Sequence, residues 1–151
     1  MKIAVASDHA GFSLKSPVIE AIKNAGHQVI DYGTDTPTKS VDFPDFASKA
    51  AKALQNKEVD RAVLICGSGV GMCIAANKFS GVNAAICHDT YSAHQGVEHD
   101  GMNTLCLGGR IIGSELASEI VASFLSAQFI SDPRFERRVN KINDIEKQER
   151  I

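Results

Sequence analysis

The chain has 151 residues, of which 44% are hydrophobic and 23% are charged, as in an ordinary folded domain. Its 16 Lys and Arg residues against 18 Asp and Glu give a net charge of -2, with no basic block to neutralise a nucleic-acid backbone. The longest apolar runs are strand-length, far below the roughly 20 residues that cross a bilayer, and the amino end does not resemble a signal peptide. We therefore expect a soluble, cytoplasmic protein with a single domain over 1–151 and no nucleic-acid or membrane partner.

Short apolar runs alternate with helical patterns along the chain. The expected strands, in chain order, are Lys2–Ala6, His27–Asp31, Arg61–Cys66, Val82–Cys87 and Thr104–Leu107. Helical patterns lie between them near 12–25, 42–56, 70–79 and 90–99, and a further helix follows the fifth strand with Ser114 as its expected cap. Pro17 falls inside the first pattern, so that helix should either start near Ser16 or bend. The alternation predicts an α/β fold, a three-layer α/β/α sandwich with a Rossmann-like, five-stranded parallel sheet.

The last part of the chain has a different character. From Asp132 onward it is mostly charged, but an apolar stripe persists at helical spacing: Phe135, Val139, Ile142 and Ile145. A helix with so narrow an apolar face predicts docking on a partner subunit, although a solvated, frayed helix has the same pattern. Arg134 and Arg138 share one face of this helix. Two guanidinium groups on one face suit the binding of a phosphate, although a solvated face has the same pattern.

Polar residues follow every expected strand, where open parallel sheets bind their ligands. These segments are Ser7–Gly11, Gly33–Asp35, Cys66–Gly71, His88–Asp89 and Gly108–Arg110. The loop Gly67–Gly71 has glycine at every second position and leads into a helix, so its N–H groups can form an anion cradle, although a plain tight turn has the same composition. It is not a dinucleotide or Walker fingerprint, because the spacing is G-x-G-x-G after the third strand and no Lys-Ser/Thr follows.

Cys66 is the candidate reactive group because it stands at a strand end, directly before this glycine loop. Oriented N–H groups there favour a thiolate, and Ser68 can donate to it, although a buried structural thiol is the alternative. The other three cysteines lie in apolar surroundings and are expected to be buried: Cys73, Cys87 and Cys106.

The histidines divide by their context. His9 follows Asp8 at a strand end, where the pair can orient an imidazole for acid–base chemistry, and His99 precedes the fifth strand. Either could instead be structural, and His88 and His94 stay unassigned. No H-x-H or H-x-x-x-H spacing supports a metal site, so we expect no metal.

Taken together, these residues resemble the ribose-5-phosphate isomerase type B family, whose relatives include the galactose-6-phosphate isomerase subunits. The matching segments cover nearly the whole chain: Ser7–Gly11, Asp31–Thr34, Asp42–Pro44, Ile65–Gly71, Ala76–Lys78, His99, Asn103, Gly108–Gly113, and the pair Arg134 and Arg138. The resemblance implies an isomerase that interconverts D-ribose 5-phosphate and D-ribulose 5-phosphate through a cis-enediolate, without a cofactor. It also implies a homodimer or homotetramer in which two subunits build each site.

The resemblance also implies catalytic roles. One branch of the family uses a cysteine as its base, and another uses a glutamate at the position of Ala75. Cys66 is therefore expected to be the base here, with Ser68 assisting the thiolate and the proton movement. His99, together with Asp8, is expected to help open the furanose ring.

Two groups of binding residues follow from the same resemblance. Backbone N–H groups of the glycine loop would hold the enediolate oxygen: Gly67, Gly69, Val70 and Gly71. Imidazole and guanidinium groups would hold the phosphate: His9, Arg134 and Arg138, with Arg110 as a weaker candidate.

Two positions depart from the pattern of many relatives. Phe43 stands where they have Tyr, so a hydroxyl contact to the sugar is lost. Asp100, an expected substrate contact, stands where they have Asn, and a carboxylate cannot donate a hydrogen bond and repels an anion. These departures make a hexose 6-phosphate, such as allose or galactose 6-phosphate, an alternative substrate. A third hypothesis, which rests on the glycine loop alone, is a non-catalytic sugar-phosphate-binding module.

Overall fold

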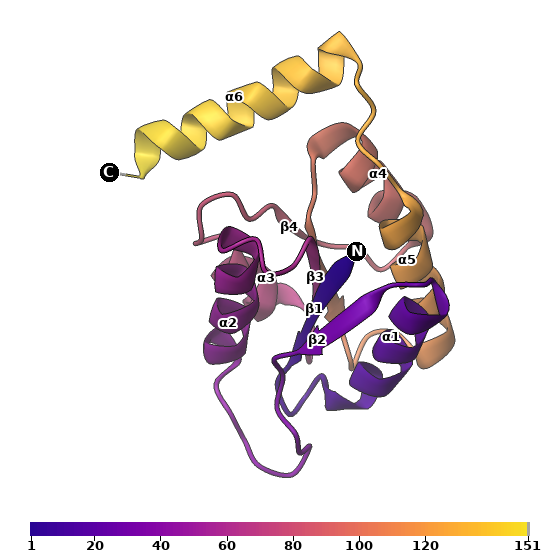
Figure 1. Ribbon diagram of the computed structural model, residues 1–151. Helices are drawn as coiled ribbons and strands as arrows, with labels where there is room; N and C mark the ends of the chain where they lie inside the picture. Colours follow the sequence, from indigo (N-terminus) through magenta and orange to yellow (C-terminus); the bar gives the residue numbers. More distant parts are fainter. Residues whose placement is uncertain (151) are drawn as a thin grey trace.

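The computed structural model describes residues 1–150 and has strands and helices in alternation over most of them (Figure 1). The elements are β1 (Lys2–Ser7), α1 (Phe12–Asn24), β2 (Gln28–Asp31), α2 (Phe43–Gln55), β3 (Arg61–Cys66), α3 (Val70–Ala76), β4 (Ala84–Ile86), α4 (Thr90–Asp100), β5 (Thr104–Gly108), α5 (Ser114–Ser126) and α6 (Pro133–Glu149). Within these residues, five parallel strands form one sheet in the order β2-β1-β3-β5-β4. The predicted α/β fold with a five-stranded parallel sheet is confirmed.

Helices cover both faces of the sheet, because the central strands are apolar on both sides. On one face α1, α4 and α5 pack around large side chains such as Val18, Leu107 and Phe124, all fully buried. On the other face α2 and α3 pack through smaller residues, among them Ala50 and Met72. Figure 1 shows these two groups of helices on opposite sides of the strands.

The strand order changes direction between the neighbouring strands β1 and β3. Strand β1 pairs with β2 on one side and with β3 on the other. The chain passes from β1 to β2 on one side of β1, and from β2 it crosses over to β3 on the other side. A topological switch point therefore forms at the carboxyl ends of β1 and β3. This point is where a ligand site is expected in an open parallel sheet.

The structure decides two details of the predicted helices. The alternative start of the first helix near Ser16 is wrong, because α1 begins at Phe12, and Pro17 lies in its second turn, where it has no N–H to donate to the Ser13 carbonyl. The expected cap of the helix after the fifth strand is also wrong. The N-cap of α5 is Gly113, and Ser114 is the first helical residue, which makes no capping hydrogen bond with its side chain. Apolar packing of α1 and α5 against each other and the sheet outweighs these local signals.

Strand β4 is shorter than the expected run from Val82 to Cys87. Asn103 Oδ1 accepts from the Asn83 N–H at 2.9 Å, and Asn77 Oδ1 accepts from the Ala84 N–H at 2.8 Å. Side-chain amides therefore replace strand partners at the start of this edge strand, and regular pairing is confined to three residues.

Helix α6 extends away from the sandwich (Figure 1). Asp132 caps it by accepting from the Arg134 N–H at 2.8 Å. Phe135 stacks on His99 of α4, with ring centroids 4.0 Å apart. Further along, Ile142 is 45% exposed and Ile145 is 60% exposed. The apolar stripe is thus only partly covered by its own chain, and docking of α6 on a partner subunit stays a prediction.

Among residues 1–150, none of the helices is both long enough and apolar enough to cross a membrane.

Candidate active site

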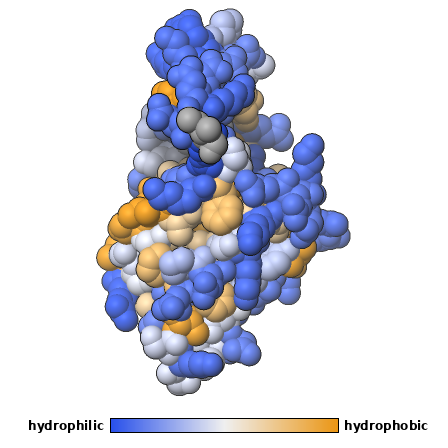
Figure 2. All heavy atoms as spheres, turned by 90° about the vertical axis from the view of Figure 1, so that its left-hand side faces the viewer, coloured by the Kyte–Doolittle hydropathy of each residue, from blue (hydrophilic) through white to orange (hydrophobic). Residues whose placement is uncertain are grey.

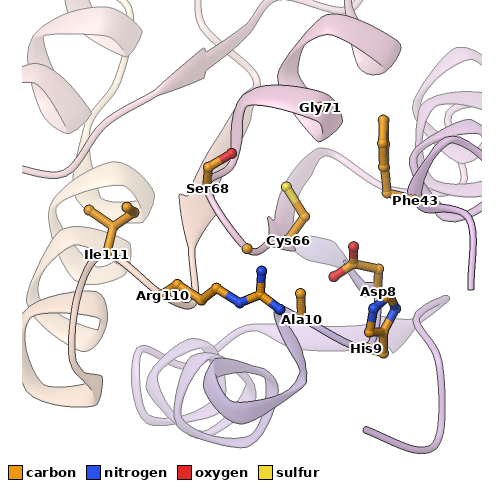
Figure 3. Close-up of a pocket in the computed structure, with 10 residues that line it drawn as sticks. Asp8, His9, Ala10, Phe43, Cys66, Ser68, Gly71, Arg110 and Ile111 are labelled. Atoms are coloured by element: carbon orange, nitrogen blue, oxygen red, sulfur yellow. The ribbon is translucent and has the colours of Figure 1, made fainter. Parts of the chain in front are cut away.

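A pocket of about 440 Å³ opens at the carboxyl ends of β1, β3 and β5 (Figure 3). Its lining comes from the loops after these strands and from the start of α2 and α3: Asp8, His9, Ala10, Phe43, Cys66, Gly67, Ser68, Gly71, Arg110 and Ile111. The structure therefore brings together most of the residues that the sequence singled out after the first, third and fifth strands.

Cys66 lies at the centre of this pocket, at the end of β3 (Figure 3). Its Sγ accepts a hydrogen bond from the Gly69 N–H at 3.1 Å. Gly69 has a φ of +81°, and this left-handed turn directs its N–H back toward the sulfur. A donor at this distance stabilises a thiolate more than a thiol. Ser68, which is exposed, accepts from the Val70 N–H at 3.3 Å through its hydroxyl.

Asp8 and His9 form the wall that follows β1. Asp8 is 5% exposed, and its Oδ1 accepts from the Gly11 N–H at 2.9 Å. His9 Nδ1 accepts from the Val41 N–H at 3.2 Å, so the neutral ring carries its proton on Nε2. Within residues 1–150 that N–H has no hydrogen-bond acceptor, so it can donate to a bound anion.

The segment after β5 forms the opposite wall. The Gly109 N–H donates to the Cys66 carbonyl at 2.8 Å, and the Arg110 N–H donates to the Gly67 carbonyl at 3.0 Å. These two bonds fix the backbone of Gly109 and Arg110, and the Arg110 guanidinium lies at the pocket beside Cys66 (Figure 3). Arg110, the weaker phosphate candidate from the sequence, is therefore the cation that this chain itself supplies to the pocket lining.

Phe43 closes the pocket at the start of α2. A Cβ placed on Gly71 would lie 2.7 Å from the ring atoms Cε2 and Cζ of Phe43. Such a distance is too short for carbon atoms, so this packing requires glycine at position 71.

His99 and Asp100 are not part of this pocket. They lie in the last turn of α4, which returns the chain to the amino end of β5, and Asn83 before β4 bonds the neighbouring Gly101 carbonyl at 3.1 Å. Within a single chain, His99 therefore lies away from Asp8, Cys66 and Ser68, and its expected role together with Asp8 stays a prediction. Gln95 Nε2 lies 3.1 Å from His99 Nδ1 and donates to Asp100 Oδ2 at 3.2 Å.

Arg134 and Arg138 also lie outside the pocket, on the exposed part of α6. Arg134 donates to both carboxylate oxygens of Asp132, at 3.1 Å from Nε and 3.0 Å from Nη2. These hydrogen bonds lower the pKa of Asp132 to about 2. One edge of the Arg134 guanidinium is thus occupied, whereas Arg138 is exposed on the surface of α6.

The thiols outside the pocket differ from one another. Cys87 and Cys106 are buried as expected, and burial raises the pKa of Cys87 to about 11. Cys73 is only half-buried, and a hydrogen bond from Cys106 lowers its pKa to about 7. Among residues 1–150, His, Cys, Asp and Glu side chains form no group of three or more that could hold a metal ion.

Sequence reasoning gave no role to three residues at or behind the pocket. Ala10 and Ile111 line it, and both lie inside motif segments, Ser7–Gly11 and Gly108–Gly113, in which roles were assigned only to other positions. His88, left unassigned, accepts a hydrogen bond from the Gly108 N–H at 3.0 Å through Nε2. The available signal was its position directly after the fourth strand, equivalent to that of Asp8 after the first.

Comparisons with known proteins agree with this geometry. The family model described as Ribose/Galactose Isomerase matches residues 3–142. Ribose-5-phosphate isomerase B of Escherichia coli is 43% identical over 145 residues, which cover 96% of each chain. D-erythrulose-4-phosphate isomerase of Pectobacterium atrosepticum is 40% identical over 129 residues, 85% of each chain. The structure of type B ribose 5-phosphate isomerase from Trypanosoma cruzi superposes with a TM-score of 0.95 at 42% identity, covering 99% of this chain and 100% of that one. The chain therefore belongs to the Ribose/Galactose Isomerase family and is an isomerase.

Proposed function

We propose that this protein interconverts D-ribose 5-phosphate and D-ribulose 5-phosphate, with Cys66 as the base and without a cofactor. The observation that carries the proposal is a thiol faced by a backbone N–H, in one pocket with two groups that can bind a phosphate, His9 and Arg110. An aldose–ketose isomerase needs both parts, because the phosphate holds the reacting carbons against the base. The Escherichia coli relative, which is named for this activity, supports the substrate.

The proposed reaction moves one proton from C2 to C1 of the open-chain sugar. The Cys66 thiolate takes the C2 proton, the electrons of that C–H bond form the C1–C2 double bond, and the C1 carbonyl oxygen becomes the enediolate oxygen. A proton then passes from O2 to O1 with help from the Ser68 hydroxyl. The Cys66 thiol returns its proton to C1, the C2 carbonyl forms, and the thiolate is restored.

The loop after Cys66 supplies the electrostatic part of catalysis in this proposal. The proposed donors to the enediolate oxygen are backbone N–H groups of Gly67, Gly69, Val70 and Gly71. The Gly69 N–H already donates to Cys66 Sγ, and the Val70 N–H already donates to Ser68 Oγ. An enediolate oxygen held between these two atoms would accept from the same N–H groups without a rearrangement of the loop. Preorganised donors of this kind are commonly worth about 3 kcal/mol of transition-state stabilisation each.

A second copy of the chain completes the proposed site. His99 of that copy would open the sugar ring with Asp8, and Asp100 beside it would contact the sugar. Arg138, and the free edge of Arg134, would join His9 on the phosphate. Exposed apolar residues support a homodimer or homotetramer, because α6 carries Ile142 and Ile145, and α3 beside the pocket carries Val70 and Ile74, 47% and 59% exposed. Figure 2, which views the side with α2 and α3, has apolar side chains gathered below a hydrophilic α6.

The substrate has an alternative. Phe43 offers no hydroxyl to the sugar, and Asp100 offers no hydrogen-bond donor, so a hexose 6-phosphate remains a second candidate. The Pectobacterium atrosepticum relative is named for a four-carbon sugar phosphate, and substrate length therefore has to be measured across four, five and six carbons.

The first experiment measures ketose formation from ribose 5-phosphate without added metal or nucleotide. Cys66→Ala should lower kcat/KM by about 10²–10⁴-fold, the usual contribution of a positioned base. Cys73→Ala removes a thiol outside the pocket and should leave the rate unchanged. Activity that survives Cys66→Ala would move the base to another group, and a large preference for a four-carbon or six-carbon phosphate would overturn the pentose substrate.

A second experiment tests the shared site. Cys66→Ala and His99→Ala are purified separately, and each should be nearly inactive. After mixing and subunit exchange, activity should return to about a quarter of the wild-type value, because half of the dimers are hybrids and each hybrid contains one intact site. Absence of any recovery, in a mixture that native mass spectrometry reports as exchanged, would contradict a site built from two chains.

A further inference from the structure

His88 stands where the hydrogen-bond ladder between β4 and β5 comes to an end. The last aligned pair is Ile86 with Cys106, and two residues further the same register sets His88 opposite Gly108. At the start of the ladder the Thr104 N–H donates to a backbone carbonyl, that of Asn83. At its end the Gly108 N–H donates instead to His88 Nε2, at 3.0 Å. An imidazole nitrogen thus replaces the missing backbone acceptor of a buried N–H group.

Gly108 lies directly behind the loop that carries the proposed base. A Cβ on Gly108 would lie 2.9 Å from the backbone carbon and oxygen of Ser68, so the two segments are in close contact. The next two residues, Gly109 and Arg110, donate to the carbonyls of Cys66 and Gly67. A shift of Gly108 would therefore move this loop and the Arg110 side chain together.

The hydrogen bond needs a particular form of the ring. Nε2 can accept only when it carries no proton, so His88 must be neutral with its proton on Nδ1. Burial lowers the pKa of His88, with the nearby Asp89 acting in the opposite direction, and the neutral form is accordingly favoured. Without this acceptor, the Gly108 N–H at the end of the β4–β5 ladder would lose its partner, which costs about 1–3 kcal/mol for a buried donor.

We propose that His88 is a positioning residue for the isomerase reaction, and that its Nε2 holds Gly108 so that Cys66 and Arg110 keep their places in the pocket. His88 itself is not among the residues that line the pocket, and the bond from its Nε2 goes to the backbone N–H of Gly108. The inference rests on the proposed function for its kinetic part, whereas its geometric part concerns the Cys66 loop alone.

The test compares substitutions that keep or remove the acceptor. The side-chain oxygen of His88→Gln reaches the position of Nε2, whereas that of His88→Asn reaches only the position of Nδ1, and His88→Leu has no acceptor. We expect His88→Gln to keep kcat/KM within about threefold of wild type, and both other variants to lose about 10- to 100-fold, as for misplacement of catalytic groups by about 1 Å. The loss should fall mainly on kcat, because Cys66 moves relative to the reacting carbons. His27→Leu, at the opposite end of the sheet, is the control and should match wild type.

Alkylation of Cys66 by iodoacetamide, followed by peptide mass spectrometry, gives a readout that needs no substrate. Its rate should change in His88→Asn and His88→Leu and be restored in His88→Gln. Equal rates and equal kcat/KM in all three variants would overturn the proposal, and so would equal losses in all three, since the acceptor would then be irrelevant. If His88→Leu does not fold, the comparison of His88→Asn with His88→Gln still tests the proposal. If wild type turns over no sugar phosphate, the proposed function fails while the alkylation rates still test the positioning role.

Discussion

Gly69 and Gly26 form a matched pair for alanine substitution. Both have a left-handed backbone, with φ of +81° and +83°, so an alanine costs about 1–2 kcal/mol at either position. A Cβ on Gly26 would meet nothing within 4 Å, whereas one on Gly69 would lie 3.1 Å from the carbonyl carbon of Leu107 and 3.3 Å from its oxygen. Because Leu107 belongs to the buried strand β5 and cannot easily move, overpacking should add about 1–3 kcal/mol for Gly69→Ala.

The free energy of unfolding is measured by urea titration followed by circular dichroism. Gly26→Ala should lose about 1–2 kcal/mol and Gly69→Ala about 2–5 kcal/mol, the sum of the backbone and overpacking costs. In thermal unfolding, each kcal/mol should lower Tm by about 2–4 °C for a chain of this size. Equal losses in the two variants would refute the reasoning, because they would mean that the contact with Leu107 relaxes without cost.

The same pair separates stability from catalysis. The Gly69 N–H donates to Cys66 Sγ, and a displaced loop loses this bond. At a temperature where both variants are folded, Gly69→Ala should lower kcat/KM for ribose 5-phosphate by at least about 10²-fold, the loss seen when one preorganised donor is removed. Gly26→Ala should retain the wild-type value. Full activity in Gly69→Ala would contradict a role for the loop in holding the thiolate.

Three further predictions concern other parts of the molecule. Arg61 Nη2 donates to the Ala127 carbonyl at the end of α5, at 2.7 Å, so Arg61→Met should lower the free energy of unfolding by about 1.5–3 kcal/mol, measured in urea. The pKa of Cys73 is lowered to about 7, and that of Cys87 is raised to about 11. The rate of Cys73 alkylation should therefore rise as pH increases through about 7, whereas Cys87 should stay unmodified at pH 8. Both are measured by peptide mass spectrometry, and equal labelling of the two thiols would contradict these pKa values. A Cβ on Gly11 would lie 2.5 Å from the Ile65 carbonyl oxygen, so Gly11→Ala should yield little folded protein, and a normal circular dichroism melting curve would refute this.

Local sequence signals predicted the strands well, because each is a short apolar run that must be covered on both faces. They failed where packing or a side chain outweighed a local preference. Helix α1 continues through Pro17 because its apolar face, with Leu14 and Val18 fully or nearly buried, packs on the sheet and on α5. Strand β4 is short because Asn103 and Asn77 take hydrogen bonds that a regular strand would make. Neither effect is visible from the order of residue types in a local window.

The sequence by itself determined the fold class and the loops that carry the candidate site. Alternating strands and helices lead to a parallel sheet, and a parallel sheet collects the segments after its strands at one edge. Asp8, Cys66 and Arg110 can therefore be assigned to one site from the sequence alone. Their hydrogen bonds could not, because these depend on the backbone direction at single residues such as Gly69.

Only the tertiary structure decided which candidates stay apart. Helix α4 runs back to the amino ends of the strands, so His99 lies away from Cys66 although both flank strands in the sequence. Only the register of β4 on β5 revealed that His88 faces Gly108. Spacing along the chain fixes which residues enter a loop or a helix. The direction in which each element packs decides which of those residues meet in space.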